Sequence, residues 1–217
     1  MATYTLLLQL AAPLQSWGAD SKFETRRTNK EPTKSGVVGL VAAALGIQRD
    51  EDDKIQKLAS LKFGVRVDKE GKLLKDFHIV QTEKKNYVTN RYYLQDAVFI
   101  AGFESDNKEE LEEIYEALKC PAYPIFLGRR ACPPARKVPL GIFSGTLKEN
   151  LETYPPAYEK ARELRVVIDA ESGNVCRDLP ISFNPNDRKH GFRAFKEYVI
   201  PVKQPGEHDP MAELDDI

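Results

Sequence analysis

The sequence predicts an α+β protein in which a larger domain with the element order βαββαβ precedes a smaller β-rich unit. Its 217 residues, 41% hydrophobic and 30% charged, are enough for one large or two small soluble domains with a sizeable core. Strand and helix patterns alternate along the first 127 residues, and only short strand patterns follow them. We therefore expect a domain over residues 1–138 and a second unit over residues 139–203.

Four segments of the first domain have strand patterns. Residues 3–10 (TYTLLLQL) and 96–103 (DAVFIAGF) are apolar almost throughout, which is typical of strands buried on both faces. In residues 61–68 (LKFGVRVD) apolar and polar side chains alternate, as in a half-buried strand. Residues 123–127 are expected to form a short fourth strand that leads into a glycine-containing loop.

Helices are predicted between these strands. Residues 36–45 (GVVGLVAAAL) are apolar on nearly every side, begin after Ser35 as the cap and end at Gly46. Residues 108–118 (KEELEEIYEAL) are amphipathic. A short helix over residues 50–60 begins with DEDD, which either favours the helix dipole or contacts a basic partner. The resulting βαββαβ order is the ferredoxin-like pattern, which RRM-type RNA-binding domains also have.

A polar and basic insertion, residues 73–94, interrupts this domain. Its only short apolar pairs are Leu73/Leu74 and Ile79/Val80, and it is rich in basic and aromatic side chains, among them Lys84, Lys85, Arg91 and Tyr92. This composition is poor for a core but suits a nucleic-acid surface, because rings stack on bases while cations meet phosphates. We expect a projecting β-hairpin or a partly disordered segment here.

The C-terminal part divides into two stretches. Residues 139–203 show short strand patterns, with a hairpin signal at residues 172–174 (SGN). Residues 204–217 carry five acidic side chains and no Lys or Arg, so we expect an acidic, disordered tail. The rest of the chain is therefore mildly positive.

Bulk properties exclude several functional classes. The net charge of −1 means that any site for a polyanion must come from local patterning. No apolar run approaches 18 residues and no signal-peptide pattern is present, so no membrane association is expected. Three cysteines without C-x-x-C spacing indicate neither a disulfide framework nor a zinc site, which fits a cytoplasmic protein. No nucleotide-binding or metal-binding motif is present, so no cofactor is predicted.

The strongest functional signal lies in residues 125–137 (IFLGRRACPPARK). Gly128 permits a tight turn with positive φ, and the planar guanidinium groups of Arg129 and Arg130 match phosphate oxygens. No acidic residue occurs between Glu116 and Glu149, which indicates a polyanion partner. The alternative is a solvated loop whose arginines pair with distant carboxylates.

Further candidates lie before and at the start of the first helix. The preceding loop interleaves aromatic residues with basic ones, including Arg26 and Arg27, as on RNA-binding surfaces. Trp17 in this loop is either a core lid or a base-stacking residue. Lys34 and Ser35 stand at the helix N-terminus, where anions are favoured.

Four segments in this order carry a family resemblance: LLLQLAAPLQSWG, PTKSGVVGLVAAALGIQRD, RYYLQDAVF and FLGRRACP. Together they resemble the CasD family of the RAMP superfamily, subunits of the type I-E CRISPR surveillance complex Cascade. The resemblance covers most of residues 1–135. It implies a non-catalytic RNA-binding subunit in antiviral defence, which holds the 5′ handle of the crRNA at one end of the complex. It also implies contacts with the backbone-forming subunit and the large PAM-reading subunit, and indirectly with target DNA.

Carried onto this sequence, the resemblance implies a ferredoxin-like palm, a thumb hairpin at residues 73–94 and a glycine-rich loop at residues 128–130. Together with the composition, it predicts an RNA site formed by Arg26, Arg27, Lys34, Ser35, Lys84, Lys85, Arg91, Tyr92, Gly128, Arg129 and Arg130.

The competing hypothesis is a metal-independent endoribonuclease that processes CRISPR repeat RNA. Such an enzyme needs a general base, a general acid and a cation that stabilises developing charge. The candidates in this sequence are His78, Tyr92 and either Lys84 or Lys85. A nucleotide or small-molecule enzyme is disfavoured because no corresponding motif follows a strand.

Overall fold

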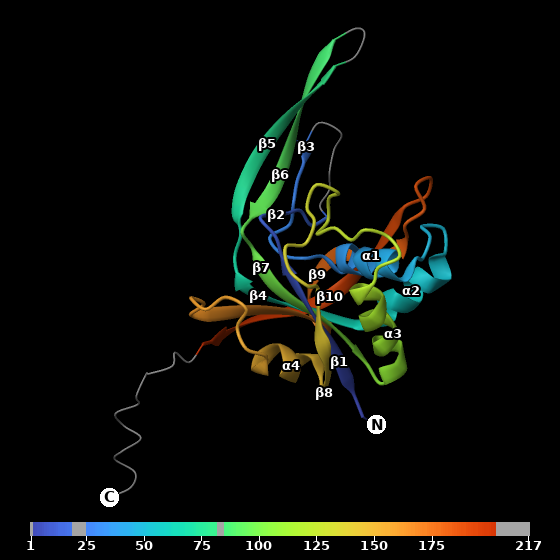
Figure 1. Cartoon of the computed structure of the whole chain (residues 1–217), viewed down its shortest axis with the longest axis vertical. Coiled ribbons are helices and arrows are strands. Elements are labelled where there is room, and N and C mark those ends of the chain that lie inside the picture. Colours follow the sequence, from blue (N-terminus) through green and yellow to red (C-terminus); the bar gives the residue numbers. More distant parts are fainter. Residues whose placement is uncertain (1, 19–24, 82–84, 203–217) are drawn as a thin grey trace, which may run out of the picture.

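The computed structural model describes residues 2–18, 25–81 and 85–202. Its centre is a six-stranded sheet in the order β10-β9-β4-β7-β1-β8, in which every neighbouring pair is antiparallel (Figure 1). The strands are β1 (Tyr4–Ala11), β4 (Lys62–Lys69), β7 (Val98–Ser105), β8 (Pro139–Ser144), β9 (Glu163–Ser182) and β10 (Lys189–Pro201).

Helices cover both faces of this sheet. On one face lie α1 (Lys34–Leu45), α2 (Asp52–Ser60) and α3 (Lys108–Lys119), and on the other lies α4 (Leu147–Thr153) (Figure 1). Strand β1 is buried from both sides: Leu6, Leu8 and Leu10 belong to the larger core, whereas Leu7 packs in the smaller core with α4. Its apolar run, interrupted only by Gln9, is therefore explained by two cores that share one strand.

The first helix begins two residues earlier than expected, at Lys34. Thr33 caps α1, because its hydroxyl accepts a hydrogen bond from the amide of Gly36, so the prediction of Ser35 as the cap was wrong. The end of the helix was predicted correctly at Gly46, which has φ +77°. Trp17 is fully buried against Gly36, which makes it a core lid.

A second, smaller sheet projects from the body (Figure 1). Strands β5 (Lys72–Gln81) and β6 (Asn86–Gln95) form an antiparallel hairpin, so the expected hairpin is confirmed. The loop before α1 adds two short strands to β6: β2 (Leu14–Gln15), antiparallel, and β3 (Thr25–Arg26), parallel. Neither short strand has a sequence signal of its own, because two residues are too few for a periodic pattern.

Two predictions of local structure were wrong. Residues 123–127 form no strand, and the strand that pairs with β1 opposite β7 is β8. The expected turn at residues 172–174 is a bulge inside β9, because Asp169 and Val175 pair with the adjacent residues Phe195 and Ala194. A carbon added at Gly173 would lie 2.4 Å from the carbonyl oxygen of Phe195, so this bulge requires glycine.

The boundary between residues 138 and 139 stays a prediction, although strands from both of its sides share one sheet. The predicted acidic tail, residues 204–217, lies outside the described residues. Within the described part of the chain, no helix has the length and apolarity needed to cross a membrane.

The buried residue Arg66 provides a test of the smaller core. Its guanidinium pairs with Asp68 at 2.7 Å and donates to the carbonyls of Leu151 and Pro155, with both charged side chains fully buried. Arg66→Ala leaves Asp68 uncompensated, so we expect a loss of about 3–5 kcal/mol in the free energy of unfolding. Urea denaturation measures this loss.

The control is Lys62→Ala, which removes a partly exposed ion pair with Glu104. Exposed pairs contribute about 0–1 kcal/mol. Equal losses for the two variants would contradict a structural role for the buried pair.

Candidate nucleic-acid interface

Three segments that are distant in sequence meet around a groove of about 720 Å³ at the N-terminus of α1. The first is the loop that carries Arg26 and Arg27, and the second is the turn at Gly128 and Arg129. The third is the β9–β10 pair with its connecting loop, which contributes Arg177, Arg188, His190 and Arg193. Ser35 and Gly36 of α1 also line this groove. Five of the residues predicted from sequence are therefore brought together here: Arg26, Arg27, Ser35, Gly128 and Arg129.

Lys34 does not belong to this set. Its ammonium is buried and pairs with Asp169 at 2.8 Å, and its backbone amide donates to Asp178 at 2.8 Å. The expectation that Lys34 presents its charge to a phosphate at the helix N-terminus is corrected by this arrangement. A carboxylate of the protein itself already occupies part of that N-terminus.

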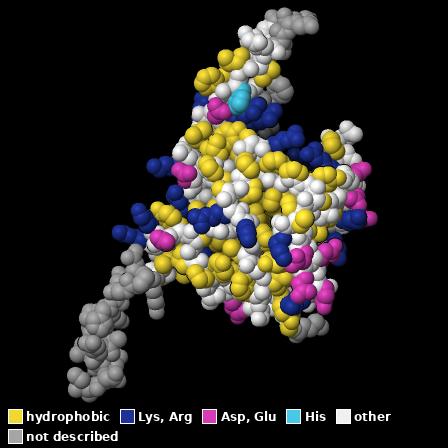
Figure 2. All heavy atoms as spheres, in the orientation of Figure 1, with side chains coloured by type: hydrophobic (Ala, Val, Ile, Leu, Met, Phe, Trp, Pro, Cys, Tyr) yellow, Lys and Arg dark blue, Asp and Glu magenta, His cyan; other side chains and the backbone are white. Residues whose placement is uncertain are grey.

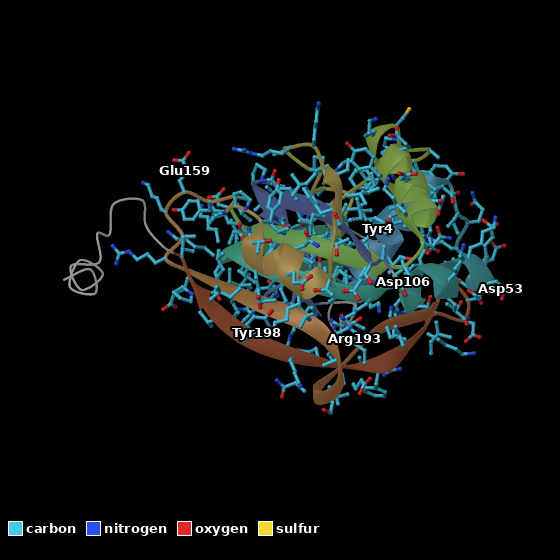
Figure 3. The ribbon with its side chains drawn as sticks, turned by 90° about the horizontal axis from the view of Figure 1, so that it is seen from below. Tyr4, Asp53, Asp106, Glu159, Arg193 and Tyr198 are labelled. Atoms are coloured by element: carbon cyan, nitrogen blue, oxygen red, sulfur yellow. The ribbon has the colours of Figure 1, made fainter. Side chains whose placement is uncertain are left out.

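Arg193 completes this buried charge cluster. It donates to Asp169 at 2.7 Å and to Asp178 at 2.6 and 2.9 Å, so two cations face two carboxylates. Burial is the largest single influence and opposes the charged form of Asp178. The hydrogen bonds and charge of Arg193, together with hydrogen bonds from Cys176 and the amide of Lys34, outweigh it and lower the pKa of this carboxyl group. Figure 3 shows Arg193 at the part of β10 near the helices, whereas Tyr198 lies farther along, towards α4.

Cys176, next to this cluster, donates its thiol proton to Asp178. Burial and the neighbouring carboxylate raise the pKa of Cys176 to about 12. The thiol therefore stays protonated at neutral pH and is a poor nucleophile.

The groove is electropositive. Its lining includes six arginines (Arg26, Arg27, Arg129, Arg177, Arg188 and Arg193) and only two acidic residues, Glu31 and Asp178. Both acids are paired, Glu31 with Arg165 at 2.9 Å and Asp178 with Arg193. Figure 2 shows basic side chains gathered below the projecting hairpin, while acidic ones gather over α2 and α3.

Sequence reasoning missed the contribution of β9–β10. Arg177, Arg188 and His190 are scattered through a polar stretch, and only the hairpin fold places them opposite Gly128. Burial, together with the charges of Arg188 and Arg177, lowers the pKa of His190. The arginine charges, which add to the effect of burial, are therefore felt on this side of the groove.

The turn at Gly128 is fixed by a close approach within the protein. Gly128 has φ +91°, and an added carbon would lie 1.5 Å from the carbonyl oxygen of Ser16. The amide of Ser16 also donates to the carbonyl of Leu127 at 3.1 Å. Glycine is needed here to let two segments of the chain cross, which the sequence alone could not distinguish from an approach to a ligand.

A second hollow of about 630 Å³ continues from the groove, since both are lined by Ser35, Gly36, Gly128 and Arg188. Its other lining residues are mainly apolar and aromatic, and they include Gly39, Leu40, Ile47, Tyr123, Phe126 and Phe183. Rings and glycine faces of this kind offer flat apolar surfaces beside the arginines.

The remaining predicted residues lie outside the groove. Arg130 is exposed next to it, and Arg91 and Tyr92 lie on β6, where Arg91 pairs with Arg26 of β3. Lys85 is exposed near the tip of the hairpin, about 30 Å from its base for a strand of this length. Lys84 lies outside the described residues.

The residues proposed for catalysis do not converge. In the register of β5 and β6, His78 faces Thr89 and Tyr92 faces Lys75. Because side chains alternate along a strand, His78 and Tyr92 project from opposite faces of the hairpin. His78 instead pairs with Asp76 at 2.7 Å. Among the described residues, no group of His, Cys, Asp and Glu is arranged to hold a metal ion.

Comparison with known proteins assigns the family. The family model described as CRISPR-associated protein (Cas_Cas5) matches residues 5–196. The CRISPR system Cascade subunit CasD of Escherichia coli (strain K12) is 35% identical over 156 residues, which is 63% of this chain and 70% of that protein. The chain therefore belongs to the Cas5 family of CRISPR-associated proteins.

Two solved structures are similar over nearly the whole chain. One, described as a crystal structure of a Cas protein, has a TM-score of 0.75 and 39% identity, and covers 91% of this chain and 95% of its own. The other, described as a CRISPR RNA-guided surveillance complex, has a TM-score of 0.77 and 30% identity over 98% of both chains.

The crossing at Gly128 yields a prediction about stability. We expect Gly128→Ala to lower the free energy of unfolding by at least about 1–3 kcal/mol, the cost of a strained positive-φ residue, because the new carbon also clashes with the backbone of Ser16. Thermal or urea unfolding measures the loss.

Gly39→Ala is the matched control. Its added carbon would lie 3.7 Å from Phe183, an ordinary contact, and alanine is the better helix former. A Gly128→Ala protein as stable as Gly39→Ala would show that the turn at Gly128 is not fixed by this crossing.

Proposed function

We propose that this protein is a non-catalytic, RNA-binding subunit of a Cascade-type CRISPR surveillance complex, and that it holds the 5′ handle of the crRNA. Support comes from its 35% sequence identity to a Cascade subunit and from its similarity, over 98% of both chains, to a chain described as a CRISPR RNA-guided surveillance complex. The observation that carries the proposal is the electropositive groove, where arginines from three segments converge.

The groove suits the backbone of a single-stranded RNA. Three of its exposed arginines, Arg26, Arg27 and Arg188, would bind phosphates, and Arg130 would extend this surface. Unstacked bases would enter the neighbouring hollow and lie against Phe126 or Phe183, since aromatic rings are the usual platform for RNA bases.

The finer fold assignments are part of the same proposal. The order β4-β7-β1-β8, with α1 and α3 as crossovers, agrees with a ferredoxin-like palm, and the β5–β6 hairpin agrees with an inserted thumb. Exposed Leu73, Phe77, Ile79 and Val88 on the hairpin would be covered in an assembly. The partners would be the backbone-forming and PAM-reading subunits, in the cytoplasm.

The separation of His78 from Tyr92 favours binding over cleavage. General acid–base catalysis requires both groups within hydrogen-bond reach of one phosphodiester, and here they project from opposite faces of a strand pair. Specific cleavage of repeat RNA by the pure protein in EDTA, lost in His78→Ala, would overturn this choice.

Co-purification tests the main proposal. The tagged protein is expressed with its neighbouring operon and a CRISPR array, and the bound RNA is sequenced. RNAs with one fixed 5′ end from the repeat, together with partner proteins, are expected. Random or absent RNA, with folded partners present, would contradict the proposal.

Salt dependence tests the phosphate contacts. Arg26→Ala/Arg188→Ala should weaken binding of single-stranded repeat RNA and reduce the slope of log K against log salt by about 1.4, because each lost phosphate contact removes about 0.7. Fluorescence anisotropy at several salt concentrations measures the slope. Lys148→Ala, a charge loss on α4 across the sheet, should leave the slope unchanged.

The pH dependence tests His190. Its pKa in the free protein is lowered, and a phosphate in the groove would raise it, so the bound state takes up more protons. RNA affinity should therefore increase as pH falls below about 6.5, the ordinary histidine value, and the increase should disappear in His190→Gln. Anisotropy between pH 5.5 and 8 measures the effect, and an equal pH response of both proteins would exclude His190 from the site.

A further inference from the structure

We propose that Arg129 is a positioning residue that ties the arginine-bearing loop to the base of the hairpin, and that it does not itself bind a phosphate. The inference rests on the proposed RNA-binding function and changes the role expected for the first arginine of the Gly-Arg-Arg triplet. Its basis is the set of acceptors that the guanidinium of Arg129 already contacts.

The donors of Arg129 face main-chain carbonyls. Nη1 donates to the carbonyl of Tyr92 at 3.0 Å, and Nη2 donates to the carbonyls of Arg26 and Arg27 at 2.8 and 3.2 Å. The guanidinium also lies over the ring of Tyr93, 4.7 Å from its centroid. Hydrogen bonds from a charged donor are stronger than neutral ones, and a planar fork holds several acceptors in a fixed geometry.

These acceptors belong to two different strands. Tyr92 is on β6, at the base of the hairpin, whereas Arg26 and Arg27 lie at the end of β3. β3 has only two residues and pairs with β6 through Thr25–Asn90 and Arg26–Arg91. A strand this short has little stability of its own, so the hydrogen bonds from Arg129 contribute much of what holds β3 against β6.

The same bonds leave the neighbouring side chains available. Because Arg129 engages the carbonyls of Arg26 and Arg27, it fixes their backbone while both side chains stay exposed to the groove. Arg129 itself is half-buried, and the next residue, Arg130, is exposed. The three residues of the triplet thus have different roles. Gly128 allows the crossing with Ser16, Arg129 fixes the backbone of Arg26 and Arg27, and Arg130 adds exposed charge.

The decisive test replaces the hydrogen bonds from Arg129 with an uncharged disulfide between β3 and β6. Arg129→Ala should weaken binding of single-stranded repeat RNA at least about tenfold. Thr25→Cys and Asn90→Cys are then added in a Cys120→Ser background, because paired residues on adjacent strands have the spacing that a disulfide needs. The oxidised protein should recover an affinity within about threefold of that of the protein that keeps Arg129, and the reduced protein should not. No recovery after disulfide formation would mean that Arg129 touches the RNA.

Two further measurements keep the inference testable if a variant folds poorly. Arg129→Lys keeps the charge but lacks the planar fork whose separate nitrogens reach Tyr92 and Arg26, so it should bind RNA nearly as weakly as Arg129→Ala; wild-type affinity would overturn the inference. In RNA-free protein, hydrogen exchange at the amides of residues 25–28 should be faster in Arg129→Ala and unchanged in Arg130→Ala. Unchanged exchange in Arg129→Ala would also overturn it. If the parent protein binds no RNA, the proposed function fails, whereas the exchange experiment still tests whether Arg129 holds residues 25–28 in place.

Discussion

The groove depends on one buried charge cluster, in which Lys34 and Arg193 face Asp169 and Asp178. This cluster fastens the N-terminus of α1 to the β9–β10 pair, and residues of both elements line the groove. A buried ion pair adds little net stability compared with apolar packing, because desolvation offsets the attraction. Its value lies in geometry, since charged groups accept few alternative arrangements in a protein interior.

The cluster also explains how a chain with net charge −1 presents a positive groove. The acids nearest to the groove are each paired with a cation, Asp178 inside the cluster and Glu31 with Arg165. Other acids lie on α2 and α3, away from the groove (Figure 2). The positive potential of the groove therefore does not need a positive net charge. The nearby acids are paired with cations and the other acids lie elsewhere, so the arginines of the groove are not neutralised. Burial lowers the pKa of His190, and the positive potential of Arg188 and Arg177 lowers it further.

Much of the fold could be predicted from the sequence wherever the pattern is local. The apolar run of β1, the amphipathic α3 and the glycine after α1 each carry their signal within a few residues. The alternation in β4 located that strand, but the half-buried strand it predicted was wrong, because Arg66 and Asp68 on its polar face are buried too. The fourth strand could not be found in this way, since residues 123–127 and β8 are equally plausible by composition. Only pairing with β1, more than a hundred residues earlier in the chain, decides between them.

The candidate site shows the same limit more clearly, because residue type identified arginines but not their roles. Lys34, Arg129 and Arg193 have the side chains expected of phosphate-binding residues, yet their donors face Asp169, main-chain carbonyls and Asp178. These partners are separated from them in sequence by 15 to 135 residues. A cation is available to a ligand only when the fold has not already assigned it an acceptor. For this reason the exposed arginines of the groove, including those of β9–β10 that had no motif, are the better candidates for contact with RNA.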